Sequence, residues 1–179
     1  ERVSTNAIEY IIGKMGQVDD CVALSYMQEG HQFAVFNFPS GNRTLVYDMS
    51  TQLWHERGDF NVGQDTINRH RASYLCNWQN NIMVGDYENN NLYIWDLDQY
   101  TDNGKLIRRI RVCPHIHNER HRVFFHQMEI DMERGVGNTG TAYGSDPQVM
   151  LEYSNDGGYS YLPIQIWAKI GKIGERLTR

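Results

Sequence analysis

The sequence predicts an all-β chain built from repeated four-stranded antiparallel meanders. One stretch is typical of two short strands joined by a tight turn: it consists of Thr44–Asp48, a polar link and Leu53–Arg57. The same pattern returns 48 residues later at Leu92–Asp96. Aromatic residues make up 12% of the chain, which suits half-buried sheet surfaces. A period of about 40–50 residues, each holding several short strands, is typical of β-propeller blades.

Residues 1–20 are predicted to form a short helical or irregular lead-in. Asn6 is a candidate N-cap, and Glu9 stands three positions further on, as in a capping box. Apolar residues follow at helical spacing and are interrupted by Gly13 and Gly16. The sequence starts without an initiator methionine or a signal peptide, so we expect the chain to be a fragment of a larger protein.

Residues 21–57 are predicted to form the first blade-like meander, with Trp54 as its large packing residue. The expected strands are rich in aromatic and β-branched residues, and turn residues separate them. They are Cys21–Tyr26, Gln32–Phe38, Thr44–Asp48 and Leu53–Arg57. Residues 58–70 contain several glycine, asparagine and aspartate residues, which predicts a connecting loop between blades.

Residues 71–112 are predicted to form a second blade-like meander with the same internal order. Asparagine-rich segments separate its strands, and asparagine tolerates the left-handed conformation that tight turns need. The expected strands are Arg71–Asn77, Asn81–Asp86, Asn91–Asp96 and a longer one at Lys105–Val112. Two meanders account for about two blades.

Residues 113–179 are predicted to form an additional, partial β-region. Val123–Asp131 alternates apolar and polar residues and is expected to be a long strand. The glycine-rich segment 134–147 is expected to be a loop, and Gln148–Tyr153 a strand.

The octet Ser154–Tyr161 fits an Asp-box, S-x-D-x-G-x-T-W, with Ser160 in place of threonine and Tyr161 in place of tryptophan. In such a hairpin turn an aspartate side chain holds the backbone, glycine supplies a positive φ, and an aromatic ring packs beneath. The interpretation is a structural turn, although Asp-boxes also occur in sialidase-like propellers.

Charge and cysteine content limit the classes of function. The net charge is −5, which disfavours nucleic-acid binding through a basic surface. Cys21, Cys76 and Cys113 are far apart, form no CxxC pair and lie in or beside apolar, strand-like segments, so buried free thiols are expected. Free thiols indicate assembly in a reducing cytoplasm. No apolar run has the roughly 18–20 residues that a membrane-spanning helix needs.

Two groups of residues could hold a metal ion, and neither is assigned as a metal site. Four histidines cluster at His115, His117, His121 and His126, and His-x-His on a strand places both rings on one face. The polar turn expected at 118–120 leaves open whether the others converge. A series of aspartates followed by a glycine partly matches a calcium-binding loop. However, Tyr100 stands at a ligand position and no glutamate follows at the required distance. The residues of that hint are Asp96, Asp98, Asp102 and Gly104.

No catalytic or cofactor-binding residue is predicted. The sequence contains no nucleophile elbow, phosphate-binding loop, zinc-protease motif or dinucleotide glycine pattern. Folding could pair the carboxylates of Asp48, Asp96, Asp131 and Asp156, but turn capping explains three of them, Asp131 excepted. The basic run Arg108–Arg111 could contact phosphate; the alternative is a charged strand edge that prevents mispairing.

Several short segments, in order and spacing, resemble the packaged-DNA stabilisation proteins of short-tailed bacteriophages over nearly the whole chain. The segments are Thr44–Asp48, Trp54–Arg57, Val84–Asp86, Val123–Phe125, Glu129–Asp131, Gly135–Gly137, Asp146–Val149, Tyr153–Gly158 and Gly171–Gly174. The resemblance implies a non-enzymatic tail hub in the virion, assembled in the host cytoplasm. Such proteins form a ring on the portal and adaptor, close the channel to retain packaged DNA, and support the tail needle or tailspikes. A passing contact with DNA is possible, and none with a membrane is expected.

Two other functions remain open. The Asp-box and the many aromatic residues fit a carbohydrate-binding or glycan-hydrolysing propeller. A kelch-like adaptor is less well supported, because the paired glycines typical of that repeat are missing. Within the tail-hub interpretation, we expect the long polar segments 58–70 and 134–147 to contact other subunits or partners.

Overall fold

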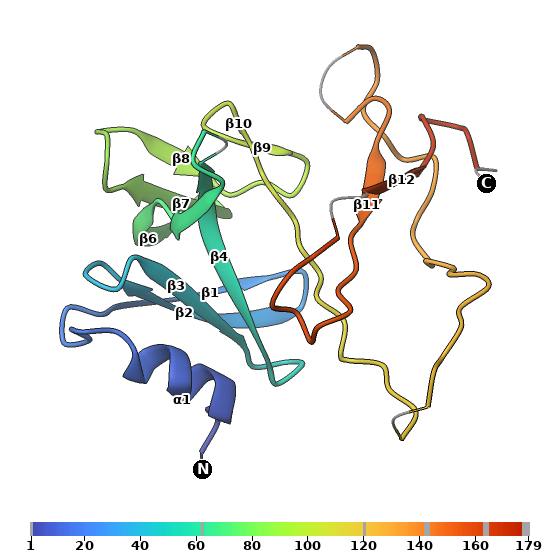
Figure 1. Ribbon diagram of the computed structural model, residues 1–179. Coiled ribbons are helices and arrows are strands. Elements are labelled where there is room, and N and C mark those ends of the chain that lie inside the picture. The colour runs from blue at the N-terminus through green and yellow to red at the C-terminus, as the bar shows by residue number, and fades with distance from the viewer. Residues whose placement is uncertain (1, 62, 120, 142–143, 163–164, 177–179) are drawn as a thin grey trace. The chain divides into compact units, whose positions relative to one another are not determined.

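The computed structural model describes residues 2–61, 63–119, 121–141, 144–162 and 165–176. The chain divides into two compact units, Glu1–Arg108 and Arg109–Arg179. The fold class is the predicted one, with short strands in antiparallel sheets and one short helix (Figure 1). No helix in the described part of the chain is long and apolar enough to cross a membrane.

The first unit begins with a five-stranded antiparallel meander in which each strand pairs with the next. Its strands are β1 (Val22–Gln28), β2 (His31–Phe38), β3 (Arg43–Asp48), β4 (Leu53–Asn61) and β5 (Thr66–Arg69). The four strands predicted between residues 21 and 57 are present. Between β1 and β2, Glu29 and Gly30 both have positive φ angles, 50° and 78°, as a two-residue hairpin turn requires.

The prediction that residues 58–70 form a loop is wrong for most of that segment. β4 continues to Asn61, and β5 folds back on it as a hairpin, with Phe60 paired to Ile67 and Asp59 to Asn68. The polar composition of residues 58–70 gave no indication of these strands. Only the turn between them remains a loop, and residue 62 of that turn lies outside the described residues.

The second sheet of the first unit has three strands, β6 (Ala72–Trp78), β7 (Asn81–Asp86) and β8 (Leu92–Ile94). The long strand predicted at Lys105–Val112 does not form. Only Lys105–Leu106 is a strand (β10), paired with β9 (Thr101–Asp102) in a separate hairpin. Lys105 and Arg108 instead form ion pairs with Asp59 and Asp65 of the β4–β5 region, which draws this segment away from β8.

The repeat of 48 residues is present in the strand register. Val35 of β2 pairs with Val46 of β3, and Met83 of β7 pairs with Ile94 of β8, each 48 positions further along the chain. The first hairpin of each sheet does not follow the repeat, because the β6–β7 turn lies two residues later than the repeat would place it.

Helix α1 (Asn6–Gly13) covers one face of the first sheet (Figure 1). Its N-cap is Thr5 and not Asn6, because Thr5 has extended backbone angles and its Oγ1 accepts the hydrogen bond from Ile8 N, at 3.3 Å. Glu9 accepts from Ser4 Oγ and does not complete a capping box. The buried contact beneath the helix consists of Ile8, Phe38 and Leu45, with Trp54 and other apolar side chains at its margin.

The second sheet covers the opposite face of the first sheet. Three buried side chains of the first sheet lie there, Tyr26, Val35 and Val46. Leu75, Ile82 and Trp95 from the second sheet pack against them. The first sheet is therefore the middle layer of three, between the helix and the second sheet.

The second unit contains one described hairpin, β11 (Gln148–Leu151) paired with β12 (Ile166–Lys169). Val123–Asp131 forms no strand, contrary to its alternating pattern, and Phe124 and Phe125 are both exposed. Alternation specifies a strand only where one face is covered, and here neither is. The described part of segment 134–147 is a loop, held by hydrogen bonds from Asn138 N to Gly144 O and from Gly174 N to Gly135 O; residues 142–143 lie outside the described residues.

The three cysteines are free, but the expectation that they are buried is wrong for two of them. Cys21 is partly buried, and burial, together with the charge of Asp20, raises the pKa of its thiol. Cys76 and Cys113 are exposed. Cys76 lies on the side of β6 that faces away from the first sheet, so the composition of the strand overestimated its burial.

Candidate functional site

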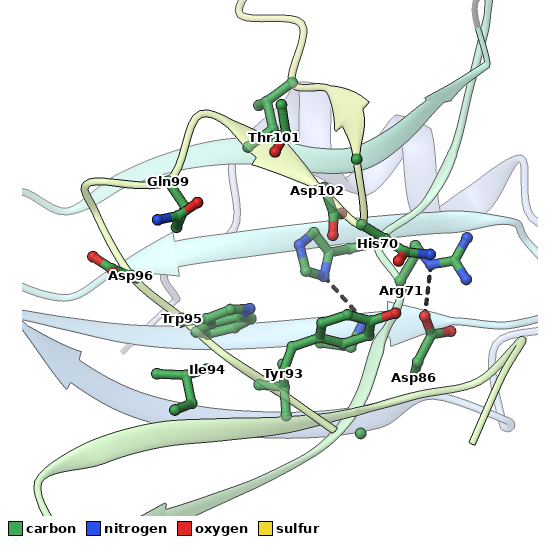
Figure 2. Close-up of a pocket in the computed structure, with 16 residues that line it drawn as sticks. His70, Arg71, Asp86, Tyr93, Ile94, Trp95, Asp96, Gln99, Thr101 and Asp102 are labelled. Atoms are coloured by element: carbon green, nitrogen blue, oxygen red, sulfur yellow. Dashed lines mark hydrogen bonds and ion pairs between the residues drawn. The ribbon is translucent and has the colours of Figure 1, made fainter. Parts of the chain in front are cut away.

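A cavity of about 340 Å³ lies in the first unit, beside the link between β5 and β6. Residues of β6, β7 and β8, of the segment between β8 and β9, and of the β9–β10 region complete its wall. Figure 2 shows His70 and Arg71 reaching this space from the link, opposite Tyr93 and Trp95. The lining combines charged groups with two aromatic rings.

Arg71 is the centre of the charged group at this cavity. Its Nε donates to Asp86 Oδ2 at 2.7 Å (Figure 2). Its Nη1 donates to Glu88 Oε2 at 2.6 Å. Asp59 Oδ2 lies 3.7 Å from the same Nη1. The side chain of Arg71 is 7% exposed and that of Asp86 is fully buried, at 0%. One guanidinium thus holds together carboxylates from β4, β7 and the β7–β8 turn.

Electrostatics keep the Arg71–Asp86 pair ionised. Burial acts to lower the pKa of Arg71, but the hydrogen bond and charge of Asp86, with the charges of Glu88 and Asp59, raise it above its ordinary value. Burial acts to raise the pKa of Asp86, but the hydrogen bond from Arg71 and those from nearby backbone groups lower it overall. Both groups therefore stay charged at neutral pH.

Lys105 and Asp102 extend the charged group into the β9–β10 hairpin. Lys105 Nζ donates to Asp59 Oδ2 at 2.9 Å, and this hydrogen bond raises the pKa of Lys105. The pKa of Asp102 is also raised, first by burial and then by the negative charge of Asp59. The group therefore holds more carboxylates than cations.

His70 belongs to a chain of hydrogen bonds that joins the two sheets. Asn37 Nδ2 donates to Ala72 O at 2.8 Å, and Thr44 Oγ1 donates to Asn37 Oδ1 at 2.6 Å. The backbone N of His70 donates to Thr44 Oγ1 at 2.9 Å, and Ala72 N donates to His70 Nδ1 at 3.1 Å. We call these four residues the polar relay. It satisfies the buried polar groups at the crossing from one sheet to the next.

Acid is expected to weaken the fold through His70. Burial, with the charge of Arg57, lowers the pKa of His70 to about 4. The folded state therefore favours the neutral ring of His70. The contribution of His70 to stability is complete above the ordinary pKa of about 6.5 and is lost as the pH falls toward about 4. The slope contributed by one such proton approaches about 1.4 kcal/mol per pH unit within this window.

Urea unfolding of the wild type and His70→Gln across this pH window tests that expectation. The pKa of His55 is also lowered, mainly by burial, and adds a slope of the same sign in both proteins. Glutamine keeps an acceptor for Ala72 N but does not titrate. The pH dependence should therefore be shallower in His70→Gln, and an unchanged slope would contradict the assignment to His70.

The arrangement is suited to fastening the two sheets together. Arg57 adds to this role, because its guanidinium carbon lies 5.5 Å from the ring centroid of Tyr26 and 5.6 Å from that of Trp95, one ring from each side of the interface. Tyr93, Trp95 and the carboxylates leave a cavity that can contact a polar or cationic group.

The histidine cluster is only partly brought together. The rings of His115 and His117 meet edge to face, with centroids 5.9 Å apart. They do not lie on a strand, while His121 forms an isolated bridge with Asn118, and His126 is exposed. Part of the turn predicted at 118–120 lies outside the described residues, at position 120. Over the part of the chain that the structure describes, no three histidine, cysteine, aspartate or glutamate side chains are placed to hold a metal ion.

The residues of the hinted calcium loop serve other roles. Asp96 Oδ1 accepts the hydrogen bond from Asp98 N at 2.9 Å, which is a local turn contact. Asp102 interacts electrostatically with Asp59 and Arg71, and Gly104, with a φ of 78°, occupies the β9–β10 turn. Asp96 therefore serves a local turn, whereas Asp102 belongs to the charged group around Arg71.

Turn capping accounts for three of the four aspartates singled out in the sequence. Asp48 accepts from Ser50 N at 2.9 Å and Thr51 Oγ1 at 2.8 Å, and Asp96 caps its own turn. Asp156 accepts from Ser160 N at 2.9 Å. Asp131 is exposed.

The turn at Ser154–Tyr161 has the aspartate hydrogen bonds and the positive glycine φ angles expected from the octet. Asp156 accepts from both the backbone and the hydroxyl of Ser160, and these bonds lower its pKa to about 2. Gly157 and Gly158 have positive φ angles of 76° and 92°. Tyr161 is exposed, so its ring is not buried beneath the turn.

The basic run at 108–111 is not a strand edge. Arg108 Nη1 pairs with Asp65 Oδ1 at 2.7 Å, and its guanidinium lies over the ring of Phe60. The first arginine of the run thus fastens the β4–β5 hairpin.

The charged group around Arg71 was not predicted from the sequence. Its members come from four separate segments, and nothing in their spacing predicts that they meet. One signal was available. Arg71 directly precedes β6 and Asp86 ends β7, so a tight β6–β7 hairpin places both residues at its open end.

Comparison with known proteins adds one finding. A family model described as "Bacteriophage P22 Gp10, beta-propeller" matches residues 1–100. The match spans α1, both sheets and most of the residues that line the cavity. No curated protein and no solved structure matches the chain.

Proposed function

This chain belongs to the phage-stabilisation family described as Bacteriophage P22 Gp10, β-propeller, and from that membership we propose that it acts as a tail hub. At the coarser level the chain is a structural protein of a phage virion that works in contact with other virion proteins. The finer proposal is that it joins the portal, closes the channel to retain packaged DNA, and supports the tail needle or tailspikes.

The match of the family model over residues 1–100 is the observation that carries this proposal. Two physical features support it. The Arg71 group and the polar relay fasten two sheets into a rigid unit, which a part that bears the pressure of packaged DNA needs. The net charge of −5 suits contact with proteins better than a grip on DNA.

We further propose that the protein is not an enzyme and that it self-associates into a ring. Assembly in the host cytoplasm is consistent with free thiols at Cys21, Cys76 and Cys113. The segments proposed for contacts are the tip of the β4–β5 hairpin and the loop at 134–147. The exposed Gln64 and Asp65 stand at that tip.

Portal binding is the decisive measurement. The intact protein is mixed with purified portal rings, and the mass of the product is determined by light scattering. A discrete complex several subunits heavier than the portal is expected. A protein that stays monomeric and leaves the portal mass unchanged would overturn the tail-hub proposal.

The hairpin tip gives a variant for the same assay. Gln64→Ala is expected to weaken portal binding or ring formation while leaving the strands intact, because its side chain is exposed and Asp65 keeps its ion pair with Arg108. Glu29→Ala, at the exposed β1–β2 turn, is the matched control. Equal binding by all three proteins would exclude the tip as a contact.

A second candidate function is carbohydrate binding. Tyr93 and Trp95 line the cavity together with Asp102, and aromatic rings with a nearby carboxylate suit sugar recognition (Figure 2). Incubation of the intact protein with a panel of capsular and lipopolysaccharide glycans tests it. Binding lost in Trp95→Ala would favour this function, and no binding would exclude it for that panel.

A further inference from the structure

The cavity beside the β5–β6 link is formed by the first unit alone, because its lining residues run from His70 to Ile107. Its volume of about 340 Å³ lies within the range of about 300–1,000 Å³ that is typical of small-molecule sites. The rings of Tyr93 and Trp95 and the carboxylate of Asp102 form part of its wall (Figure 2). The cavity therefore offers an aromatic surface and a carboxylate to one small ligand.

The charged group around Arg71 is short of positive charge. The carboxylates belong to Asp59, Asp86, Glu88 and Asp102, and the cations to Arg71 and Lys105. Both cations already form ion pairs with the first three carboxylates. Asp102 forms no ion pair within the part of the chain that the structure describes. It is therefore a carboxylate at the cavity wall that lacks a counter-ion.

The surroundings of Asp102 disfavour its ionised form as long as it has no counter-ion. Burial raises the pKa of Asp102, and the negative charge of Asp59 raises it further. His70 supplies no compensating charge, because burial lowers its pKa to about 4 and the ring is neutral at pH 7. A cation placed beside Asp102 would reverse this effect, since an opposite charge nearby favours the ionised form.

Tyr93 contributes a ring that is held in place from its hydroxyl end. Its hydroxyl oxygen accepts hydrogen bonds from Asn89 Nδ2 at 3.1 Å and from Asn91 Nδ2 at 3.2 Å. Trp95 adds a second aromatic side chain to the wall, and Ile107 adds an aliphatic one. The faces of tyrosine and tryptophan rings attract cations, and they also pack against alkyl chains. Aromatic rings beside an unpaired carboxylate suit an organic ammonium ion.

We propose that this cavity binds a small alkylammonium ion. The ammonium group donates hydrogen bonds to the carboxylate of Asp102, and the alkyl chain lies against Tyr93 and Trp95. A neutral glycan can donate hydroxyl hydrogen bonds to Asp102 but leaves its charge uncompensated, so charge distinguishes the two ligand classes. A tail-hub role neither requires nor excludes such a ligand.

Two small molecules of nearly the same shape test the charge, n-butylammonium chloride and n-butanol. Each is titrated into the intact chain, with sodium chloride added to the n-butanol samples to match ionic strength, and backbone amides are followed by NMR. The amides of Gly85 and Gly104 report on the cavity lining, and that of Gly30, in the β1–β2 turn, is the internal control.

With n-butylammonium, the signals of Gly85 and Gly104 are expected to shift to saturation. The expected dissociation constant is about 1 mM, in keeping with a ligand of so few atoms. The signal of Gly30 should stay in place, and n-butanol should bind about tenfold more weakly. The absence of a saturable shift, or equal affinity for n-butanol, would overturn the proposal.

Asp102→Asn tests the counter-ion. Asparagine keeps the shape of the side chain, and the fold should tolerate it because burial already disfavours the charge. The variant is expected to bind n-butylammonium about 10- to 100-fold more weakly. Asp19→Asn removes the same charge at an exposed position outside the cavity lining and should leave the affinity unchanged. Unchanged affinity in Asp102→Asn, or an equal loss in both variants, would contradict a role for Asp102.

Tyr93→Leu tests the aromatic wall, with Tyr93→Phe as its matched control. Leucine removes the ring and is expected to weaken n-butylammonium binding about fivefold, whereas phenylalanine keeps the ring and should bind within about twofold of the wild type. Equal affinity in Tyr93→Leu and Tyr93→Phe would exclude a contact between the ring and the cation.

A final titration distinguishes two sources of the ammonium group. Nα-acetyl-lysine methylamide carries the same group on a peptide unit. Binding at least as tight as that of n-butylammonium would assign the site to a lysine side chain of a partner protein. Weaker binding would assign it to a free amine, and both results keep the ammonium ion as the ligand.

Discussion

Replacement of Arg71 by methionine is expected to destabilise the protein by about 3–5 kcal/mol. The change leaves Asp86, which is fully buried, and Asp59 without their guanidinium partner. Removing one member of a buried ion pair costs more than the pair contributes, because the remaining charge stays desolvated. Urea unfolding followed by tryptophan fluorescence measures the change, and Trp95 lies close enough to report it.

An exposed ion pair on the same unit provides the control. Arg43 Nη1 pairs with Glu56 Oε1 at 3.0 Å, with both side chains at least 40% exposed. Arg43→Met is expected to cost about 0–1 kcal/mol, because water already solvates both charges. A loss in Arg71→Met no larger than that in Arg43→Met would contradict the view that the Arg71 group fastens the sheets.

Leu45→Ala is expected to cost about 2–5 kcal/mol. Leu45 is 1% exposed and packs with Ile8 and Phe38 beneath α1. Truncation removes apolar contacts and leaves a cavity that the sheet backbone cannot close. The loss should appear in thermal or urea unfolding, with increased hydrogen exchange in α1.

Leu53→Ala is the control for this second substitution. Leu53 lies on the neighbouring strand β4 and is 60% exposed. Its truncation is expected to change the free energy of unfolding by about 0.5 kcal/mol or less. Similar losses in the two variants would show that the helix does not cover this face of the sheet in solution.

The strands of the first unit could be predicted because their signals are local. Aromatic and β-branched segments such as Gln32–Phe38, separated by glycine and asparagine turns, define hairpins without knowledge of the rest of the chain. The repeat relating Tyr47 to Trp95 was also readable, and the strand register follows it. The aspartates at turns fall in the same class, since each bonds to a backbone or hydroxyl group within a few positions.

The predictions that were wrong concern segments whose structure depends on which other segments pack against them. Val123–Asp131 alternates as a strand does, yet it has no partner strand among the described residues. Phe60 and Ile67 form a cross-strand pair inside a segment whose composition indicated a loop. The Arg71 group arises from the meeting of four segments, and the composition of β6 does not show which side of the strand, and so which cysteine position, packs against the first sheet. Contacts between distant segments leave no periodic trace in the sequence.

The polar relay also has a consequence for the order of folding. The first sheet is a meander whose pairings are between neighbours, so it can form quickly from local contacts. The hydrogen bond from Asn37 to Ala72 closes a loop of 35 residues and can form only after both sheets exist. Interactions made late, after the folding barrier, slow unfolding more than they speed folding. The polar relay is therefore expected mainly to slow unfolding, which lengthens the lifetime of the two packed sheets.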